Sequence, residues 1–303
     1  MQNPKVSIII VNYNTCGLLR NCLISIFEKT VDIDFEVIVS DNGSKDGSID
    51  MLKREFPEVI LVENNANLGF GSANNRGLDK ARGECVFYLN SDTVLLNNAV
   101  KIFYSHWCSR EKNIGALGCV LVDSNGNLTE SYGSFPRSIK LLKSMLHHLI
   151  AFYVKNIMKL LGLDISKLRP IPVYEEKIGD VEYVVGADLF MANNEDARYD
   201  ESFFLYFEET DLQWRLRQKG LISNIVEGPK IRHLIRGGGS YLDDVMRYGS
   251  FSIIQSEISR VRYTKKNLSR VTAFLLKLMI SIQWVSPYIY KNTHKFFKTL
   301  WSV

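Results

Sequence analysis

The first third of the chain alternates between short apolar runs and segments whose apolar residues recur at helical spacing. Four runs rich in β-branched residues are expected to be strands: 6–11, 35–40, 59–63 and 85–90. Runs of this kind are typical of parallel strands covered on both faces. Helices are expected at 18–28 and 48–55, and a glycine-opened loop leads into a helix over 67–82. The alternation predicts an α/β fold with a doubly wound, mostly parallel sheet flanked by helices.

The second half of the chain is less regular. Its segments predict strands at 115–123, 183–192 and 222–225, and a helical insertion at 140–163. A loop leading into a helix is expected over 200–220, and a glycine-rich loop over 229–240. We therefore expect one α/β domain over 1–250, with a helical insertion at about 138–165. A basic, amphipathic helical extension is expected over 251–303.

A polar residue follows each of the four early strands or stands close to its end. These residues are Asn12, Asp41, Asn67 and Asp92. In doubly wound sheets, ligands bind outside the carboxyl ends of the strands, which favours a binding site here. Because loops are polar in any protein, a single such cluster is equally well explained without a ligand.

Asp92 follows the strand 85–90 in a loop, where a carboxylate suits Mg²⁺ or Mn²⁺ shared with diphosphate oxygens. The alternative is a turn aspartate that caps the next helix. Later in the chain, His233 precedes Arg236 and the glycine triplet 237–239. This combination suits a metal ligand beside a phosphate-binding loop, although a lone histidine is more often structural.

Three acids follow an aromatic run: Glu208, Glu209 and Asp211. A carboxylate beside a hydrophobic wall has a raised pKa and suits a general base. Acids at the N-terminus of a helix are also stabilised by the helix dipole without any catalytic role. The residues alone leave both explanations open.

Seven segments, in order, resemble family 2 glycosyltransferases of the GT-A fold, and within them the rhamnosyltransferase-like bacterial branch. They are VSIIIVNYN (6–14), VIVSDNGSKDGS (37–48), NNANLGFGSANNRGL (64–78), FYLNSDT (87–93), VVGADLFM (184–191), FFLYFEETDLQWRLRQKG (203–220) and 233–240. The resemblance implies an inverting, metal-dependent transferase that uses a UDP- or dTDP-sugar, dTDP-rhamnose included. Its acceptor would be a glycan or lipid-linked glycan of bacterial surface polysaccharide synthesis.

The resemblance also implies roles for single residues. Donor contacts fall on Asn12, Tyr13, Asn14, Asp41, Asn67, Asn74, Asn90, Ser91 and Arg236. Asp92 and His233 would bind the divalent metal, and Glu209 would be the general base. The acceptor side would include Gly186, Ala187 and the unusual acid Asp188.

The chain departs from the family pattern at two positions. Asn90 replaces the first acid of the D-x-D motif, and Glu209 replaces the usual aspartate base. Glu208 and Asp211 therefore remain candidate bases. By this hypothesis Glu209 deprotonates an acceptor hydroxyl, which attacks the anomeric carbon opposite the departing diphosphate and inverts it.

The formal net charge is +4, and its distribution is uneven. The segment 262–303 holds eight basic residues and no acidic one, which suggests an anionic partner surface. Residues 273–287 suit an amphipathic helix in a bilayer interface, or a helix packed on the main domain. Membrane contact would bring a lipid-linked acceptor within reach. No nucleic-acid-binding motif is present, so we expect no nucleic-acid partner.

Five cysteines, an odd number without a CxxC pair, indicate a reducing compartment. No signal peptide or spanning helix is expected, which favours a cytoplasmic protein at the inner face of the cell membrane. A nucleotidyltransferase would need a basic, glycine-rich loop where Asn12–Thr15 stands. A non-catalytic nucleotide-sugar or glycan-binding protein remains the alternative function, and the oligomeric state stays open, a homodimer included.

Overall fold

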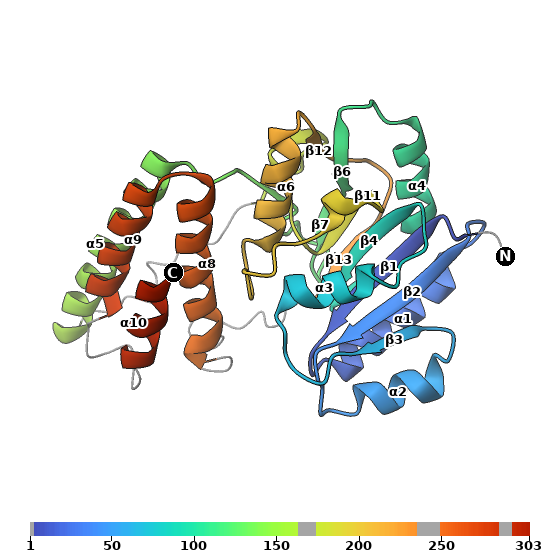
Figure 1. Cartoon of the computed structure of the whole chain (residues 1–303), viewed down its shortest axis with the longest axis horizontal. Coiled ribbons are helices and arrows are strands. Elements are labelled where there is room, and N and C mark those ends of the chain that lie inside the picture. The colour runs from blue at the N-terminus through green and yellow to red at the C-terminus, as the bar shows by residue number, and fades with distance from the viewer. Residues whose placement is uncertain (1–2, 163–173, 235–248, 285–292) are drawn as a thin grey trace. The chain divides into compact units, whose positions relative to one another are not determined.

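The structure is a computed structural model that describes residues 3–162, 174–234, 249–284 and 293–303 (Figure 1). The chain divides into two compact units. The first, which we call the sheet unit, comprises 1–135 and 174–238. The second, the helical unit, comprises 136–173 and 239–303. The inserted helix and the C-terminal extension, which the sequence suggested as separate additions, therefore belong to the same unit.

The sheet unit is built on an eight-stranded sheet over the described residues, in the order β3-β2-β1-β4-β11-β6-β12-β9. Its strands are β1 (Val6–Asn12), β2 (Phe35–Asp41), β3 (Ile60–Glu63), β4 (Cys85–Asn90), β6 (Ile114–Gly118), β9 (Gly179–Val181), β11 (Asp188–Ala192) and β12 (Ile222–Ile225). All run parallel to one another except β11 and β9, which run the opposite way. The expected mostly parallel α/β sheet is confirmed.

Helices cover this sheet. They are α1 (Cys16–Lys29), α2 (Ser48–Glu55), α3 (Phe70–Leu78), α4 (Ala99–Ser109) and α6 (Glu208–Gln218), with a short 3₁₀ turn η2 (Glu195–Ala197). The central strand β1 buries Ile8, Ile9 and Ile10 completely, so both of its faces pack against side chains. On α1 the buried residues Leu19, Cys22, Leu23 and Ile26 recur at helical spacing, which attaches that helix to the sheet.

Two small sheets complete the unit. One contains β5 (Thr93–Leu95), β13 (Ile231–His233) and β7 (Leu121–Val122), and the other pairs β10 (Tyr183–Val184) with β8 (Tyr132–Gly133). The sequence predicted one strand over 183–192, whereas the structure has two, β10 and β11. The run is interrupted because its first part pairs with β8 and its second part enters the main sheet.

The carboxyl ends of the parallel strands meet at one edge, which positions the site. Asn12 at the end of β1 is in register with Asp41 at the end of β2, and Asn90 ends β4 on the other side. Because β11 runs antiparallel to β4, its first residue, Asp188, pairs with Leu89 at this same edge. The antiparallel strand therefore brings residues 186–188 beside the polar strand ends.

The helical unit contains α5 (Ser138–Leu160), α8 (Gly249–Asn267), α9 (Arg270–Trp284) and α10 (Thr293–Ser302). Its core consists of Met145, Ile258, Val261, Ala273, Leu276, Ile280, Phe296 and Leu300. The core residues come from all four helices, so the insertion and the extension share one hydrophobic core. Within the described ranges, no helix is both long and apolar enough to cross a membrane.

Candidate active site

The loops after β1 and β2 are held together by buried hydrogen bonds. The Asn12 side chain donates to Asp41 Oδ2 at 2.7 Å and to Ser44 Oγ at 3.0 Å. The other oxygen, Asp41 Oδ1, accepts the backbone N–H groups of Gly43 and Ser44 at 3.0 and 2.8 Å. Asn12 and Asp41 are fully buried, so both support these two loops from beneath.

Two neighbours of Asn12 are arranged differently. Asn14 has a left-handed backbone, with φ of 53°, and its side-chain oxygen accepts the Lys45 N–H at 2.8 Å. Tyr13 projects a ring that is 46% exposed. Of the residues expected to contact the nucleotide at β1, Tyr13 is thus the one with an accessible aromatic face, which suits stacking on a base.

The loop before α3 closes against the loop before α6. Asn67 Oδ1 accepts the Gly69 N–H at 3.1 Å, and the Phe70 N–H donates to the Phe204 carbonyl at 2.9 Å. Gly69 has φ of 90°, and a Cβ there would collide with that same carbonyl. Asn74 is buried and bonds to the Phe70 carbonyl at 3.2 Å, which makes it part of the helix start.

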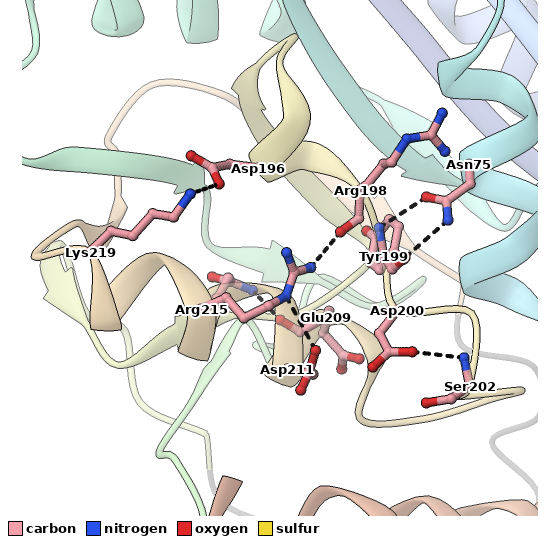
Figure 2. Close-up of polar contacts among 11 residues, drawn as sticks. Asn75, Asp196, Arg198, Tyr199, Asp200, Ser202, Glu209, Asp211, Arg215 and Lys219 are labelled. Carbon is pink, nitrogen blue, oxygen red and sulfur yellow. Dashed lines mark hydrogen bonds and ion pairs between the residues drawn. The ribbon is translucent and has the colours of Figure 1, made fainter. Parts of the chain in front are cut away.

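Asn42 and Asn75 were not singled out from the sequence, yet both bridge segments of the site. The Asn42 amide donates to the Gly69 carbonyl at 3.1 Å. The Asn75 amide donates to the Tyr199 carbonyl and accepts the Tyr199 N–H, at 3.0 and 2.9 Å (Figure 2). Asn75 therefore connects α3 to the loop that leads to α6. In the sequence, its place in an asparagine-rich stretch was the one feature that could have pointed to it.

The candidate metal ligands Asp92 and His233 lie next to each other. His233 Nε2 is 3.3 Å from Asp92 Oδ1, because β13 pairs antiparallel with β5 directly after Asp92. Asn90 Oδ1 is buried and has no hydrogen-bond partner among the described residues. Ser91 Oγ lies 3.1 Å from Thr15 Oγ1, which links this loop to the one after β1.

At this spacing both atoms could bind one divalent cation; the carboxylate suits Mn²⁺ or Mg²⁺, whereas imidazole is a less usual ligand for these oxygen-preferring ions. Within the described ranges, no group of three or more His, Cys, Asp or Glu side chains could hold a metal ion. Asp92 and His233 alone therefore do not complete the coordination shell of such an ion. Arg236 and the triplet 237–239, expected to face phosphate, lie outside the described residues.

The segment 186–188 connects the end of β4, close to Asp92 and His233, to α6. The Asn90 N–H donates to the Ala187 carbonyl at 3.0 Å. A Cβ added at Gly186 would lie 3.5 Å from Glu209 Cβ, an ordinary contact distance, so this glycine lies directly beside that glutamate. Asp188 is fully buried and accepts the Cys119 N–H at 2.7 Å, so it supports the segment from beneath. Burial raises the pKa of Asp188 to about 7, although hydrogen bonds from Cys119 and the electrostatic effect of His233 act to lower it.

The three acids at the start of α6 occupy different surroundings. Asp211 is fully buried and forms an ion pair with Arg215, whose guanidinium also reaches the Arg198 carbonyl (Figure 2). Glu208 is buried, and burial together with the charge of Glu209 raises its pKa well above the ordinary value. Only Glu209 is partly exposed among the three.

Burial also raises the pKa of Glu209, and the negative charge of Glu130 adds to the effect. Glu130 precedes β8 and belongs to no motif, so no sequence pattern singles it out. Tyr206 and Phe207, directly before α6, both have positive φ, 69° and 68°. Such a backbone is an outlier for bulky residues, and outliers of this kind concentrate at functional sites.

Comparison with known proteins identifies the family. A model described as glycosyl transferase family 2 matches residues 7–157. The uncharacterized glycosyltransferase YfnE of Bacillus subtilis (strain 168) is 28% identical over 245 residues, which cover 72% of this chain. The chain belongs to glycosyl transferase family 2. It spans 61% of the length of YfnE.

Two further similarities bear on this family 2 chain. The N-acetylglucosaminyl-diphospho-decaprenol L-rhamnosyltransferase of Mycobacterium tuberculosis (strain ATCC 25618 / H37Rv) is 27% identical over 212 residues, 65% of this chain and 66% of that protein. The mannosyltransferase PcManGT from Pyrobaculum calidifontis, solved with GDP-Man and Mn²⁺, superposes with a TM-score of 0.54 at 15% identity. That alignment covers 99% of this chain and 85% of PcManGT, and it supports the expected GT-A fold.

Proposed function

We propose that the protein is an inverting glycosyltransferase that moves a sugar from a nucleoside-diphosphate donor to an acceptor hydroxyl. The observation that carries the proposal is the continuity of the site. A backbone hydrogen bond joins Asn90 to Ala187, and Glu209 lies against the adjacent Gly186. A candidate base and a candidate metal-binding pair, Asp92 with His233, are thereby attached to the same short segment at one sheet edge.

Glu209 is the proposed general base. Its carboxylate takes the proton of the acceptor hydroxyl as that oxygen attacks the anomeric carbon. The bond from that carbon to the diphosphate oxygen breaks on the opposite face, so the configuration inverts. Partial burial suits this role, because a raised pKa makes the carboxylate a stronger proton acceptor near neutral pH.

The donor would lie along the loops after β1, β2 and β4. Tyr13 is the proposed contact of the base, and the loops held by Asn12, Asp41 and Asn67 would surround the nucleotide. Asp92 and His233 would hold a divalent cation, Mn²⁺ or Mg²⁺. When bound, such an ion supplies neutralisation of the charge that develops on the departing diphosphate. The Mn²⁺ in PcManGT supports this choice.

The proposed donor is a UDP- or dTDP-sugar, with dTDP-rhamnose among the candidates. The acceptor would be a glycan or lipid-linked glycan in bacterial surface polysaccharide synthesis. The name of the mycobacterial relative, an L-rhamnosyltransferase acting on a diphospho-decaprenol-linked sugar, supports both. A lipid-linked acceptor would place the protein at the inner face of the cell membrane.

The decisive experiment is a donor screen. Release of nucleoside diphosphate is measured for a panel of UDP-, dTDP- and GDP-sugars with Mn²⁺, with Mg²⁺ and with EDTA, and donor binding is measured by calorimetry. We expect one UDP- or dTDP-sugar to be hydrolysed slowly, and EDTA to abolish the reaction. If a donor binds but no release occurs even with lipid-linked acceptors present, the protein is a binding protein. If no donor binds at all, the proposed donor site is wrong.

A further inference from the structure

The helical unit exposes large apolar side chains along two of its helices, α5 and α9. On α5 they recur as Leu146, Ile150, Tyr153, Ile157 and Leu160, each 39–70% exposed. On α9 they are Val271, Leu275, Leu278 and Ile282, each 38–69% exposed. The α5 set follows the spacing i, i+4, i+7, i+11, i+14 and the α9 set i, i+4, i+7, i+11, so each forms one stripe along its helix. Single exposed apolar residues are normal, whereas contiguous stripes mark an interaction surface.

The two stripes lie side by side. Leu142 and Leu146 of α5 and Leu275, Leu278 and Met279 of α9 line one groove of about 400 Å³, together with Lys143. Farther along, the Tyr153 hydroxyl donates to the Ile282 carbonyl at 2.8 Å. The stripes thus form one apolar face, which we call the α5–α9 face. Met145, Ala273, Leu276 and Ile280 on the opposite sides of these helices are buried in the core.

The charge of the helical unit identifies the occupant of this face. Residues 136–173 and 239–303 contain 17 Lys and Arg against 4 Asp and Glu, a net charge of +13. The rest of the chain has 20 basic and 29 acidic residues, a net charge of −9. Within the described part of the helical unit, the one acidic side chain, Glu257, is paired with Arg260. Lys140, Lys143 and Arg270 are exposed at the α5–α9 face or near its ends.

We propose that the α5–α9 face is a docking surface for an anionic lipid bilayer. Its apolar stripes enter the boundary between headgroups and acyl chains, and Lys140, Lys143 and Arg270 contact lipid phosphates. A helix that lies in the bilayer interface needs an apolar face with basic flanks, but it does not need the length to cross the bilayer. The described helices are not long and apolar enough to cross one. A second copy is a poorer occupant, because pairing would bring together two surfaces of strong like charge.

The inference deepens the proposed function by naming the partner that brings a lipid-linked acceptor to the enzyme. It predicts that the inserted helix α5, and not the C-terminal extension alone, is required for docking. Vesicle binding is measured without donor or acceptor, so this inference and the proposed function can fail separately.

The test is flotation of the full chain with vesicles of phosphatidylglycerol and phosphatidylcholine, compared with phosphatidylcholine alone. We expect binding to the anionic vesicles only, weakened roughly tenfold or more between 50 mM and 0.5 M NaCl as the surface charges are screened. The double variant Ile150→Glu/Ile282→Glu should lose binding, since it places a carboxylate in each stripe. Ile24→Glu, at an exposed isoleucine on α1 of the sheet unit, is the matched control and should bind normally.

Circular dichroism and thermal unfolding check that the variants fold. Should the double variant unfold, Lys140→Gln/Lys143→Gln provides a second arm, which should weaken binding to anionic vesicles and reduce its salt dependence. Equal binding by wild type and both variants would overturn the proposal. So would a wild-type dimer in light scattering that the double variant converts to a monomer, without vesicle binding by either, because the face would then belong to a second copy.

Discussion

Replacing Glu209 by glutamine tests the assignment of the base most directly. The amide keeps the size of the side chain and therefore its packing beside Gly186. The Glu209 side-chain carbons lie 3.5–3.8 Å from the position that a Cβ on Gly186 would take. Stability should therefore change little. Loss of a general base typically costs a factor of 10²–10⁴, which corresponds to about 3–5 kcal/mol in the activation free energy. We expect turnover to fall by that factor while donor affinity stays nearly unchanged.

Two neighbouring acids provide the comparison. In Glu208→Gln an amide replaces a buried carboxyl whose pKa is already raised well above the ordinary value, so the charge lost is small and turnover should fall only modestly. Asp211→Asn removes the buried partner of Arg215. Because one charge of the pair is fully buried, we expect a loss of about 1–3 kcal/mol in the free energy of unfolding. At about 2–4 °C per kcal/mol, the melting temperature should fall measurably.

The assay measures the rate of nucleoside diphosphate release at saturating concentrations of donor and acceptor. Donor binding is measured by calorimetry, and folding is checked by thermal unfolding. Glu209 is the base if Glu209→Gln alone combines lost turnover with normal donor binding and a normal melting temperature. Turnover within about threefold of wild type in Glu209→Gln would refute it. Asp211→Asn with lost turnover and an unchanged melting temperature would move the base to Asp211.

Three other expectations follow from the same contacts. Glu130→Gln removes a negative charge that raises the pKa of Glu209, so the acid limb of the kcat/KM pH profile should move to lower pH, and an unmoved limb would contradict this. Gly69→Ala places a Cβ against the Phe204 carbonyl at a φ of 90°. It should lower the free energy of unfolding by about 1–3 kcal/mol and raise the KM for donor. An unchanged melting temperature would show that the loop is not packed as described. His233→Ala should raise the Mn²⁺ concentration for half-maximal activity roughly 10–100-fold, checked by Mn²⁺ titration against His106→Ala on α4.

The parallel half of the sheet could be predicted from the sequence nearly to the residue. A strand such as β1 is buried on both faces, so its composition is a continuous apolar run with clear ends. Helix α4 was not predicted, although Asn98 caps its start and the buried Ala99, Val100, Phe103 and Trp107 follow a helical spacing that would have indicated it. The division of 183–192 into two strands depends on the distant partner β8, which an apolar run cannot reveal.

The sequence predicted where a candidate residue lies when its position follows from a strand end, as for Asp41 at the end of β2 and Asp92 just after β4. It was incomplete where the partner is remote. Asn74 and Asn75 are equivalent as sequence, yet Asn75 is the one that bonds to Tyr199, 124 positions away. Glu130 acts on Glu209 through space alone and belongs to no motif. Such residues become visible only when the chain is folded.

The three acids of α6 show why the sequence left the base open and how the fold narrows it. Residues 208, 209 and 211 lie at different angles around the helix, since each residue advances the helix by about 100°. Glu208 consequently points into the core, Asp211 turns toward Arg215, and Glu209 faces the small residue Gly186. A Cβ at position 186 would come into van der Waals contact with Glu209. The geometry therefore favours Glu209, the one acid of the three that is partly exposed, and the positive φ angles of Tyr206 and Phe207 lie directly before the first residue of the helix.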